Sequence, residues 1–258
     1  MASPERIICL TEETCEWLYL LGEERRIVGI SAYTVRPERA AREKPKVSAF
    51  ISGNVAKIQK LKPDLVIGFS DIQADLAQKL IKAGLNVLVT NQRSLEEIFA
   101  TLLMVAAIVG RSERGEKIIA GWKKKLSKIR RKTRNRKKPR VFFQEWDEPV
   151  ITAIGWVSEL IAICGGTNVF RGKSGPMAAD RIVDLRAVAQ AKPDVILGSW
   201  CGKPMDFDWV KTRPELQQTP AVKNNRLFEI DSAEILQPGP ALFLDGVDRI
   251  YEALWQKP

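Results

Sequence analysis

Two stretches of the sequence, LKPDLVIGFSD at residues 61–71 and AKPDVILGSWC at residues 191–201, follow the same pattern 130 positions apart. In each, Lys-Pro-Asp ends a helical segment, because proline cannot continue a helix. A short apolar run follows, which is typical of a strand buried on both faces of a parallel sheet. A glycine and then an aromatic residue, Phe69 or Trp200, close each run. The repeat predicts two similar α/β lobes.

A second repeat opens each half. Residues 6–13 and residues 140–148 both read as a strand that runs into an acidic loop, and an amphipathic helix follows each. Those helices end at Gly22 and at Gly165-Gly166, where glycine suits a left-handed cap. Two pseudo-equivalent lobes account for both repeats.

The periodicity of apolar residues predicts the elements of each lobe and of the segment between them. Strands are expected at 6–10, 27–30, 64–69 and 86–90, with helices at 13–21, 54–61 and 73–83. The second lobe is expected to have strands at 140–145, 194–199 and 226–230, with helices at 156–164, 184–191 and 240–256. The predicted division is a first lobe over 1–92, a helical connection over 93–139 and a second lobe over 140–258.

The connecting segment has helical spacing and contains no proline between residues 94 and 138. Ser94 and Glu97 form a capping box for a helix over 94–109. A second helix of about 25 residues is expected from residue 112, and at ~1.5 Å per residue it is long enough to bridge two lobes.

The composition is that of a soluble globular protein, with 45% hydrophobic and 28% charged residues in 258. No stretch approaches 18 consecutive apolar residues, so no membrane-spanning helix is expected. The N-terminus lacks the pattern of a signal peptide. The sequence as written therefore predicts a cytoplasmic protein, or a periplasmic one if an upstream signal has been removed.

Four cysteines, no CxxC pair and no histidine argue against a metal site and against catalysis by a histidine-dependent nucleophile. Two enzymatic interpretations remain open. Cys201 could act as a thiol nucleophile, and Glu145, Asp147 and Glu148 could act as paired acids and bases. The alternative is that these carboxylates solvate a loop or bind the polar edge of a ligand.

The net charge of +10 comes from one segment. Residues 123–140 hold twelve Lys or Arg and no acid, and +10 less these twelve leaves −2 for the rest of the chain. The preferred interpretation is the solvated face of a long helix. An interaction with nucleic acid or another anionic surface is the alternative, and nucleic acid is not expected as a partner.

Ligands of open parallel sheets bind outside the carboxyl ends of the strands. Large aromatic residues gather at those ends here, and a cleft lined by them suits a large flat ligand with polar edges. They are Tyr33, Phe50, Phe69, Trp146, Trp156 and Trp200.

These stretches resemble the helical-backbone periplasmic binding proteins, the receptors of ABC importers for cobalamin, siderophores and haem. The resemblance is carried by RIICLTEETCEWLYLLG, VSAF…IQKLKPDLVIGF, VSELIAICGGTNVF and AKPDVILGSW, which cover most of the chain. It implies two Rossmann-like α/β lobes with mostly parallel sheets, bridged by a long α-helix. It also implies a monomeric, non-catalytic protein that binds a small molecule between its lobes and delivers it to a permease.

Within the family the chain is most similar to the cobalamin receptors, whose aromatic cleft sandwiches the corrin and supplies no metal ligand. The resemblance implies that cobalamin or a related corrinoid is the ligand. The six aromatic residues and Met177 would contact its faces, and Glu145, Arg181 and Gln237 would meet its amide edge. The alternative ligand is an iron siderophore or another metal chelate, bound by arginines such as Arg36, Arg39, Arg42 and Arg181.

The chain departs from the family pattern at its expected contacts with a permease. The family uses one acidic residue on each lobe, but the first position is Ala56 in this sequence. Asp206, Asp208 or Glu215 could serve in the second lobe. A stand-alone corrinoid-binding protein that lacks a permease partner is therefore also open.

Overall fold

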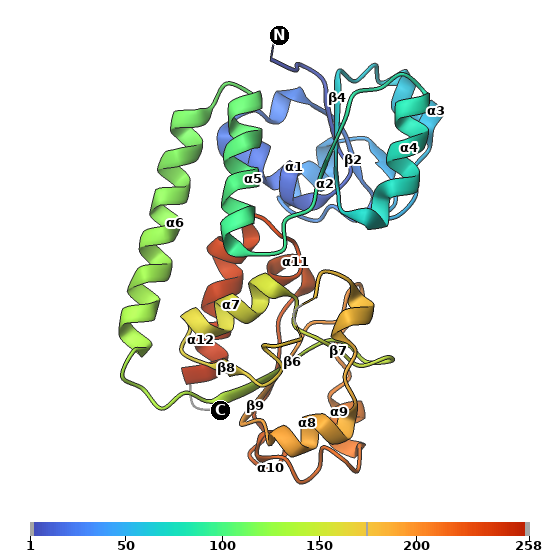
Figure 1. Cartoon of the computed structure of the whole chain (residues 1–258). Helices are drawn as coiled ribbons and strands as arrows, with labels where there is room; N and C mark the ends of the chain where they lie inside the picture. Colours follow the sequence, from blue (N-terminus) through green and yellow to red (C-terminus); the bar gives the residue numbers. More distant parts are fainter. Residues whose placement is uncertain (1–2, 174, 256–258) are drawn as a thin grey trace. The chain divides into compact units, whose positions relative to one another are not determined.

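The computed structural model describes residues 3–173 and 175–255, and its chain divides into two compact units, Met1–Ala120 and Gly121–Pro258 (Figure 1). The division falls inside α6 (Ser112–Thr133), the long green helix in Figure 1. Each unit contains one mostly parallel sheet with helices of its own, which confirms the predicted α/β class. The predicted lobe boundaries after residues 92 and 139 stay a prediction.

The first unit has a five-stranded sheet in the order β3-β2-β1-β4-β5, and all of its strand pairs are parallel. The strands are β1 (Ile7–Cys9), β2 (Ile27–Ser31), β3 (Lys46–Ser48), β4 (Leu65–Phe69) and β5 (Val87–Thr90). The helices are α1 (Glu12–Leu21), α2 (Glu38–Glu43), α3 (Val55–Lys60), α4 (Ala74–Lys82) and α5 (Leu95–Ile108), with short 3-10 turns η1 (Glu24–Arg26) and η2 (Asp71–Gln73). Because β1 lies between β2 and β4, the loops that leave these strands meet at one edge of the sheet.

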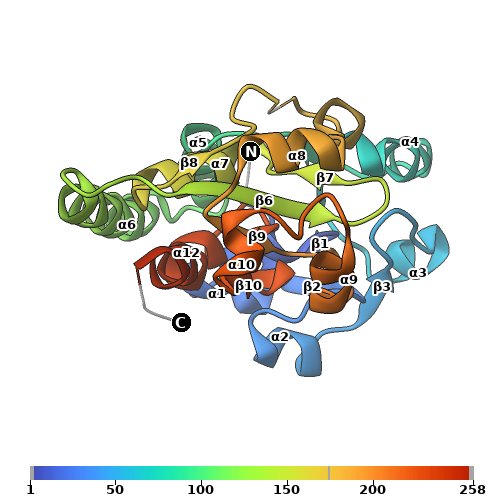
Figure 2. The same ribbon diagram turned by 90° about the horizontal axis from the view of Figure 1, so that it is seen from below.

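The second unit has a sheet in the order β10-β9-β6-β7, with β8 also paired to β6. Its strands are β6 (Arg140–Trp146), β7 (Ile151–Thr152), β8 (Thr167–Asn168), β9 (Val195–Gly198) and β10 (Leu227–Glu229). Strand β7 runs antiparallel to β6, whereas β8 and β9 run parallel to it. The succession β6, β9, β10 can be followed in Figure 2. The helices are α7 (Gly155–Ile163), α8 (Leu185–Ala191), α9 (Phe207–Thr212), α10 (Pro220–Lys223), α11 (Ser232–Ile235) and α12 (Val247–Trp255), with a 3-10 turn η3 (Ala178–Arg181) and a π-turn η4 (Leu242–Gly246).

The two Lys-Pro-Asp motifs have the same local structure in both units. Lys62 and Lys192 share a left-handed φ of 46°, so the helical turn stops at the same point of each motif. The aspartate that follows then binds the start of the first strand of its unit. Asp64 accepts a hydrogen bond from the backbone N–H of Arg6 at 3.0 Å, and Asp194 accepts one from that of Arg140 at 2.7 Å. The sequence repeat is therefore a repeat of backbone geometry.

The glycine of each repeated stretch leaves room for one side chain above the sheet. A Cβ on Gly68 would lie 2.7 Å from Oε1 of Gln73, and a Cβ on Gly198 would lie 2.1 Å from Sδ of Met205. Both distances are shorter than van der Waals contact, so each glycine is required by the side chain that covers it.

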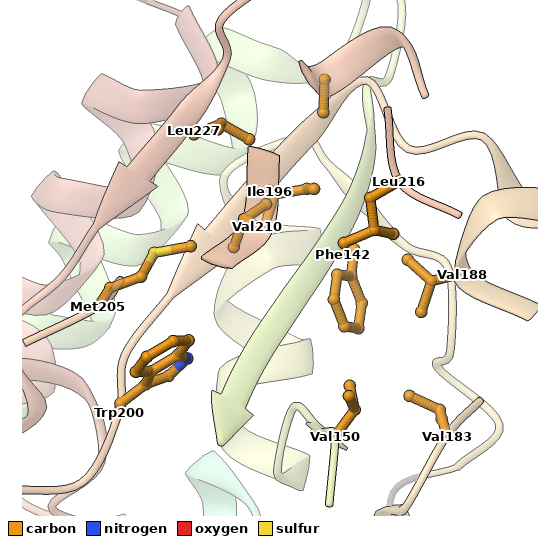
Figure 3. Close-up of a cluster of buried hydrophobic side chains, with 11 residues drawn as sticks. Phe142, Val150, Val183, Val188, Ile196, Trp200, Met205, Val210, Leu216 and Leu227 are labelled. Carbon is orange, nitrogen blue, oxygen red and sulfur yellow. The ribbon is translucent and has the colours of Figure 1, made fainter. Parts of the chain in front are cut away.

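Each unit buries a hydrophobic cluster of its own. In the first unit the cluster joins β1, β3 and β4 to α3 and α4, through Ile8, Leu10, Val47, Ile58, Val66, Leu76 and Leu80. The second cluster surrounds Phe142 of β6 and is drawn in Figure 3. It includes Trp200, which lies beside Met205 in that view. The apolar run of β9 is buried throughout, and that of β4 is buried from Val66 onward, as expected for parallel strands.

The two ends of α6 each contact the end of another helix. In the first unit, Nε of Arg114 donates to the carbonyl of Leu20 at 2.9 Å, beside the left-handed cap Gly22. In the second unit, Oγ1 of Thr133 donates to the carbonyl of Ile163 at 3.3 Å, at the end of α7. Both contacts satisfy carbonyls that lack an intrahelical partner.

The predicted strands and helices agree with the structure to within one residue at each end, with two exceptions. The helix expected to run about 25 residues from residue 112 ends after 22 residues, at Thr133. The last helix was expected over 240–256, but α12 begins at Val247 after η4, and residue 256 lies outside the described residues. Seven short strands and α-helices of the described chain were not predicted, namely β3, β7, β8, α2, α9, α10 and α11. Elements of two to six residues are too short for their apolar residues to repeat with a measurable period.

Candidate functional site

Apolar side chains reach solvent at the carboxyl edge of the first sheet. Tyr33, which follows β2, is 64% exposed, and Ile51, which follows β3, is 63% exposed. The neighbouring Phe50 is half-buried. Of the predicted aromatic residues of this unit, Tyr33 presents the most open ring, while Phe69 at the end of β4 is 7% exposed. This edge can offer flat apolar surface to a ligand.

An arginine covers the ring of Phe69. The guanidinium carbon of Arg93 lies 5.0 Å from the ring centroid, a cation–π distance, and its Nη2 donates to Oδ1 of Asp71 at 3.2 Å. A ligand that stacks on Phe69 would have to displace or contact this arginine. Contact between Phe69 and a ligand stays a prediction.

Gln73 ties together three of the loops at this edge. Its Oε1 accepts from the backbone N–H of Phe69 at 3.0 Å, and its Nε2 donates to the carbonyls of Phe50 at 2.7 Å and of Leu10 at 3.3 Å. The side chain is buried, so these bonds are shielded from water. The sequence did not predict a role for Gln73. The only signal was Gly68, and the sequence alone does not show which side chain requires a glycine at that position.

Two buried glutamates follow β1 at the start of α1. Burial raises the pKa of Glu13 to about 7. Burial, and after it the charge of Glu16, raises the pKa of Glu12 to about 8. Nε of Arg36 donates to Oε1 of Glu16 at 3.0 Å, and the hydroxyl of Thr11 donates to Oε1 of Glu13 at 2.6 Å. The carboxyl groups of Glu12 and Glu13 therefore bind protons near neutral pH.

A buried ion pair organises the carboxyl edge of the second sheet. Arg181, only 3% exposed, donates through Nη2 to Oε1 of Glu145 at 2.9 Å and through Nη1 to the carbonyl of Thr152 at 2.7 Å. The guanidinium therefore joins the end of β6 to β7 and to η3. The sequence predicted both residues of the ion pair as ligand contacts, but it did not predict that they bind each other.

A lysine lies between two of the predicted indoles. Nζ of Lys203 is 4.4 Å from the ring centroid of Trp146 and 4.9 Å from that of Trp200. It also donates to Oδ2 of Asp147 at 2.8 Å. Desolvation opposes ionisation of Asp147, but Lys203 and nearby backbone N–H groups outweigh it and lower the pKa of that carboxyl. The sequence did not predict a role for Lys203, because lysines are common in exposed loops and no local pattern distinguishes this one.

Buried polar atoms without a partner among the described residues gather at the same edge. They are both side-chain atoms of Gln144, the hydroxyl of Ser199 and the indole nitrogen of Trp200. Gln144 lies in β6, and Ser199 and Trp200 directly follow β9, which pairs with β6. The backbone N–H of Ser199 donates to the carbonyl of Gln144 at 2.9 Å. Such groups cost free energy unless water or a ligand satisfies them, so this edge suits a ligand with polar groups.

The other predicted contacts in this unit differ in their exposure. Trp156 is 2% exposed, and its Nε1 donates to the carbonyl of Ile235 at 3.0 Å. Trp200 is 3% exposed and packs edge-to-face on Trp209, with ring centroids 5.9 Å apart. Met177 is 46% exposed, whereas Gln237 is half-buried. Trp156 and Trp200 thus lie in the interior of the second unit, and their contact with a ligand stays a prediction.

The geometry does not favour the enzymatic interpretations. Desolvation, and then the charge of Glu145, raises the pKa of Cys201, so its thiol stays protonated at neutral pH. The three acids of the β6–β7 region each have a cationic partner, and Glu148 accepts from Nη2 of Arg213 at 2.7 Å. Within residues 3–173 and 175–255, no three His, Cys, Asp or Glu side chains come together as a possible metal site.

The arginines that a siderophore could use are compensated. Arg36 pairs with Glu16, Arg39 pairs with Glu43, and Arg42 lies 3.5 Å from Glu38. These pairs lower the attraction of this region for an anionic chelate. Among the described residues, no helix combines the length and the hydropathy that a bilayer span requires.

Comparison with known proteins agrees with the two-sheet fold. A family model described as "Periplasmic binding protein" matches residues 7–234. The vitamin B12-binding protein of Vibrio vulnificus is 29% identical over 243 residues, which cover 93% of this chain and 86% of that protein.

Two solved structures extend this comparison. The periplasmic vitamin B12 binding protein BtuF of Vibrio cholerae matches with a TM-score of 0.78 at 25% identity, over 98% of this chain and 97% of BtuF. The periplasmic heme-binding protein RhuT from Roseiflexus matches with a TM-score of 0.79 at 25% identity, over 97% of this chain and 99% of RhuT. Relatives with different named ligands thus share this fold. Because the family model spans most of the chain, and the parallel sheets carry the expected repeat, the chain belongs to the periplasmic binding protein family, whose members are non-catalytic substrate-binding proteins of ABC transporters.

Proposed function

We propose that this chain captures cobalamin or a related corrinoid for an ABC importer. Side chains at the carboxyl edges of both sheets would contact the ligand. The open ring of Tyr33 and the exposed Met177 would lie against the corrin faces, and polar groups such as Gln144 and Ser199 would meet its amide edge. The names of the B12-binding relatives support this choice of ligand.

The observation that carries the proposal is the balance of charge at these edges. The predicted arginines are paired with glutamates, and Lys203 is paired with Asp147. An anionic siderophore would have to compete with those carboxylates. A corrinoid with a rim of neutral amides needs apolar faces and hydrogen-bonding groups instead, which are what these edges offer.

Haem is the second candidate, because one exposed side chain could bind iron. The chain has no histidine, but Tyr33 is exposed at the carboxyl edge and a tyrosine oxygen can serve as an axial ligand of haem iron. RhuT, which has a similar fold, is named as a heme-binding protein. The ring of Tyr33 suits a corrinoid and its oxygen suits haem, so the two candidates can be separated at this residue.

Calorimetric titration with cyanocobalamin, hemin and a ferric hydroxamate siderophore tests the proposal. Saturable binding of cyanocobalamin alone is expected. Tyr33→Ala should weaken it about tenfold, since ~1.4 kcal/mol of lost ring contact corresponds to that factor. Tyr33→Phe should leave cobalamin binding unchanged, because it keeps the ring and removes only the oxygen.

Ile81→Ala is the matched control, because Ile81 is 60% exposed near the end of α4 and is not among the residues predicted to contact the ligand. It should leave every titration unchanged. If hemin binds and Tyr33→Phe abolishes the visible spectrum of the complex, the proposed ligand would be haem and not cobalamin. Heat only with the siderophore would contradict both assignments.

An ABC permease is the partner that the family implies, and we propose that it contacts acidic side chains of the second unit. Asp206 caps α9 by accepting from the backbone N–H of Trp209 at 2.9 Å, whereas Asp208 is exposed on the same helix. Glu215 is half-buried, and Ala56 is exposed but offers no charge. Asp208 is therefore the best candidate contact. Delivery to an importer requires the protein to work outside the cytoplasm, which fractionation of native cells would test.

A further inference from the structure

A basic hollow lies in the second unit, where the end of α6 approaches the end of α7. Its volume is about 570 Å³. It is lined by Arg130, Arg131, Thr133, Arg134, Lys138, Ala162 and Gly165. These residues come just before β6 and β8, so the hollow lies at the amino edge of the sheet, opposite the edge described as the candidate ligand site. We call this group of residues the basic hollow.

The charge of the basic hollow is largely uncompensated. Its four cations, Arg130, Arg131, Arg134 and Lys138, are exposed, and the described part of the chain gives none of them a salt bridge or a side-chain hydrogen bond. The helix dipoles of α6 and α7 place a partial charge of roughly −0.5 elementary charge at each carboxyl end. About three positive charges therefore remain without a partner.

Other cations of the same segment are used inside the unit. Lys125 lies 2.6 Å from Asp248, Arg140 lies 3.3 Å from Asp194, and the guanidinium of Arg136 lies 4.7 Å from the ring centroid of Trp255. These contacts separate the basic segment into structural cations and the free cations of the basic hollow. Exposed lysines around it, Lys124, Lys128, Lys132 and Lys137, extend the positive surface.

We propose that the basic hollow and its surrounding lysines form a docking surface for the phosphate headgroups of an anionic lipid membrane. The four cations of the hollow would bind one phosphate headgroup, and the exposed lysines of the same segment would contact further ones. Clusters of four to eight Lys or Arg bind anionic lipid in this way. An ABC permease lies in a membrane, so a protein that delivers substrate to it works beside a lipid surface.

Nucleic acid fits the basic hollow less well than lipid. Single-stranded nucleic acid is bound on aromatic platforms, and no aromatic residue lines the hollow. The ring of Trp255 lies under the guanidinium of Arg136, and its indole N–H donates to the carbonyl of Cys164 at 2.7 Å. A confined hollow also differs from the long groove that follows a polymer backbone.

Co-sedimentation with phospholipid vesicles tests the proposal. The intact protein should bind phosphatidylcholine vesicles that contain phosphatidylglycerol, should not bind pure phosphatidylcholine, and should be released by high salt. The variant R130Q/R131Q/R134Q should bind about 100-fold more weakly at low ionic strength, because each surface cation contributes about fivefold. R130K/R131K/R134K keeps the charge and should bind like the intact protein.

The matched control is K60Q/K79Q/K82Q, which removes the same number of exposed charges from α3 and α4 of the first unit. It should keep most of the vesicle binding. Equal losses in both triple variants would overturn the proposal, since binding would then follow net charge alone.

Two further probes separate the sources of phosphate. Soluble tripolyphosphate that saturates the protein while phosphatidylglycerol vesicles do not bind would assign the hollow to a free oligophosphate and overturn the membrane proposal. Tighter binding to a short DNA duplex than to vesicles would also overturn it. The cyanocobalamin titration of the arginine variant should match that of the intact protein, so failure of either proposal is seen separately.

Discussion

The two repeated stretches place a glycine at the same point of a buried strand, yet opposite chemistry covers it. Above Gly68 lies the amide of Gln73, which binds three loops, whereas above Gly198 lies the thioether of Met205, which belongs to the hydrophobic cluster of Figure 3. The two units therefore share the space above the strand, but the side chains that fill it make different interactions.

The same contrast extends to how each sheet edge is held. The first edge depends on a neutral amide and on glutamates that keep their protons, and the second depends on the ion pair of Arg181 with Glu145. The amide of Gln73 loses little when salt or pH changes. The buried glutamates lose their contribution as the pH rises through their raised pKa values, and the ion pair responds to the loss of either partner. Variants that break one edge at a time separate these two kinds of support.

The largest effect is expected for Arg181→Ala. It leaves Glu145 without its buried partner and should destabilise the second unit by about 3–5 kcal/mol. Urea unfolding combined with hydrogen exchange would locate the loss in residues 140–200. Arg186→Ala, at an exposed arginine nearby, is the control and should cost less than about 0.5 kcal/mol. Equal costs for the two variants would contradict a structural role for the ion pair.

Gln73→Ala should cost about 3 kcal/mol in the first unit, because three buried hydrogen bonds of ~1 kcal/mol each are lost. Faster amide exchange is expected at Phe69, whose N–H donates to Gln73. Gln78→Ala on the exposed face of α4 is the matched control. Unchanged exchange at Phe69 in Gln73→Ala would show that the loops are held by other contacts.

Glu13→Gln should alter how stability depends on pH. Burial raises the pKa of Glu13 to about 7, so the native state binds its proton more tightly than the unfolded state, whose pKa is ~4.5. Its contribution is complete below pH ~4.5 and is lost as the pH rises to about 7. Between pH 5 and pH 8 the intact protein should lose about 2 kcal/mol more than the variant. Parallel curves for the two proteins would refute the raised pKa.

The smallest effect is expected for Lys203→Met, which removes the cation between Trp146 and Trp200 but keeps an apolar stem. A cost of about 1 kcal/mol is expected from the lost partner of Asp147 and the lost cation–π contacts. Tryptophan fluorescence should change as well. Lys223→Met, at an exposed position, serves as the control and should leave both stability and fluorescence unaltered.

Much of the fold could be predicted because it depends on local rules. Proline after Lys62 and Lys192, buried apolar runs and glycine caps placed the parallel strands and the long helix close to their observed positions. These signals are properties of a few neighbouring residues, and sequence displays them directly.

The candidate site was harder to predict because its contacts join distant residues. Arg181 binds Glu145 across 36 positions and Gln73 binds Leu10 across 63, and neither pair shows itself in a local pattern. The aromatic residues illustrate the same limit. Tyr33 and Trp156 both follow strands, but only Tyr33 presents its ring to solvent, and the difference comes from neighbours such as Ile235 that lie far along the chain.

The cysteines have a practical consequence for spectroscopy. Cys9, Cys15 and Cys164 are buried, and Cys201 is exposed directly after Trp200, at the carboxyl edge of the second sheet. At neutral pH a maleimide dye should therefore attach to Cys201 alone, and slowly, because the raised pKa of this thiol keeps most of it protonated. The native chain thus provides a single attachment point for a fluorescent sensor that reports ligand capture in real time.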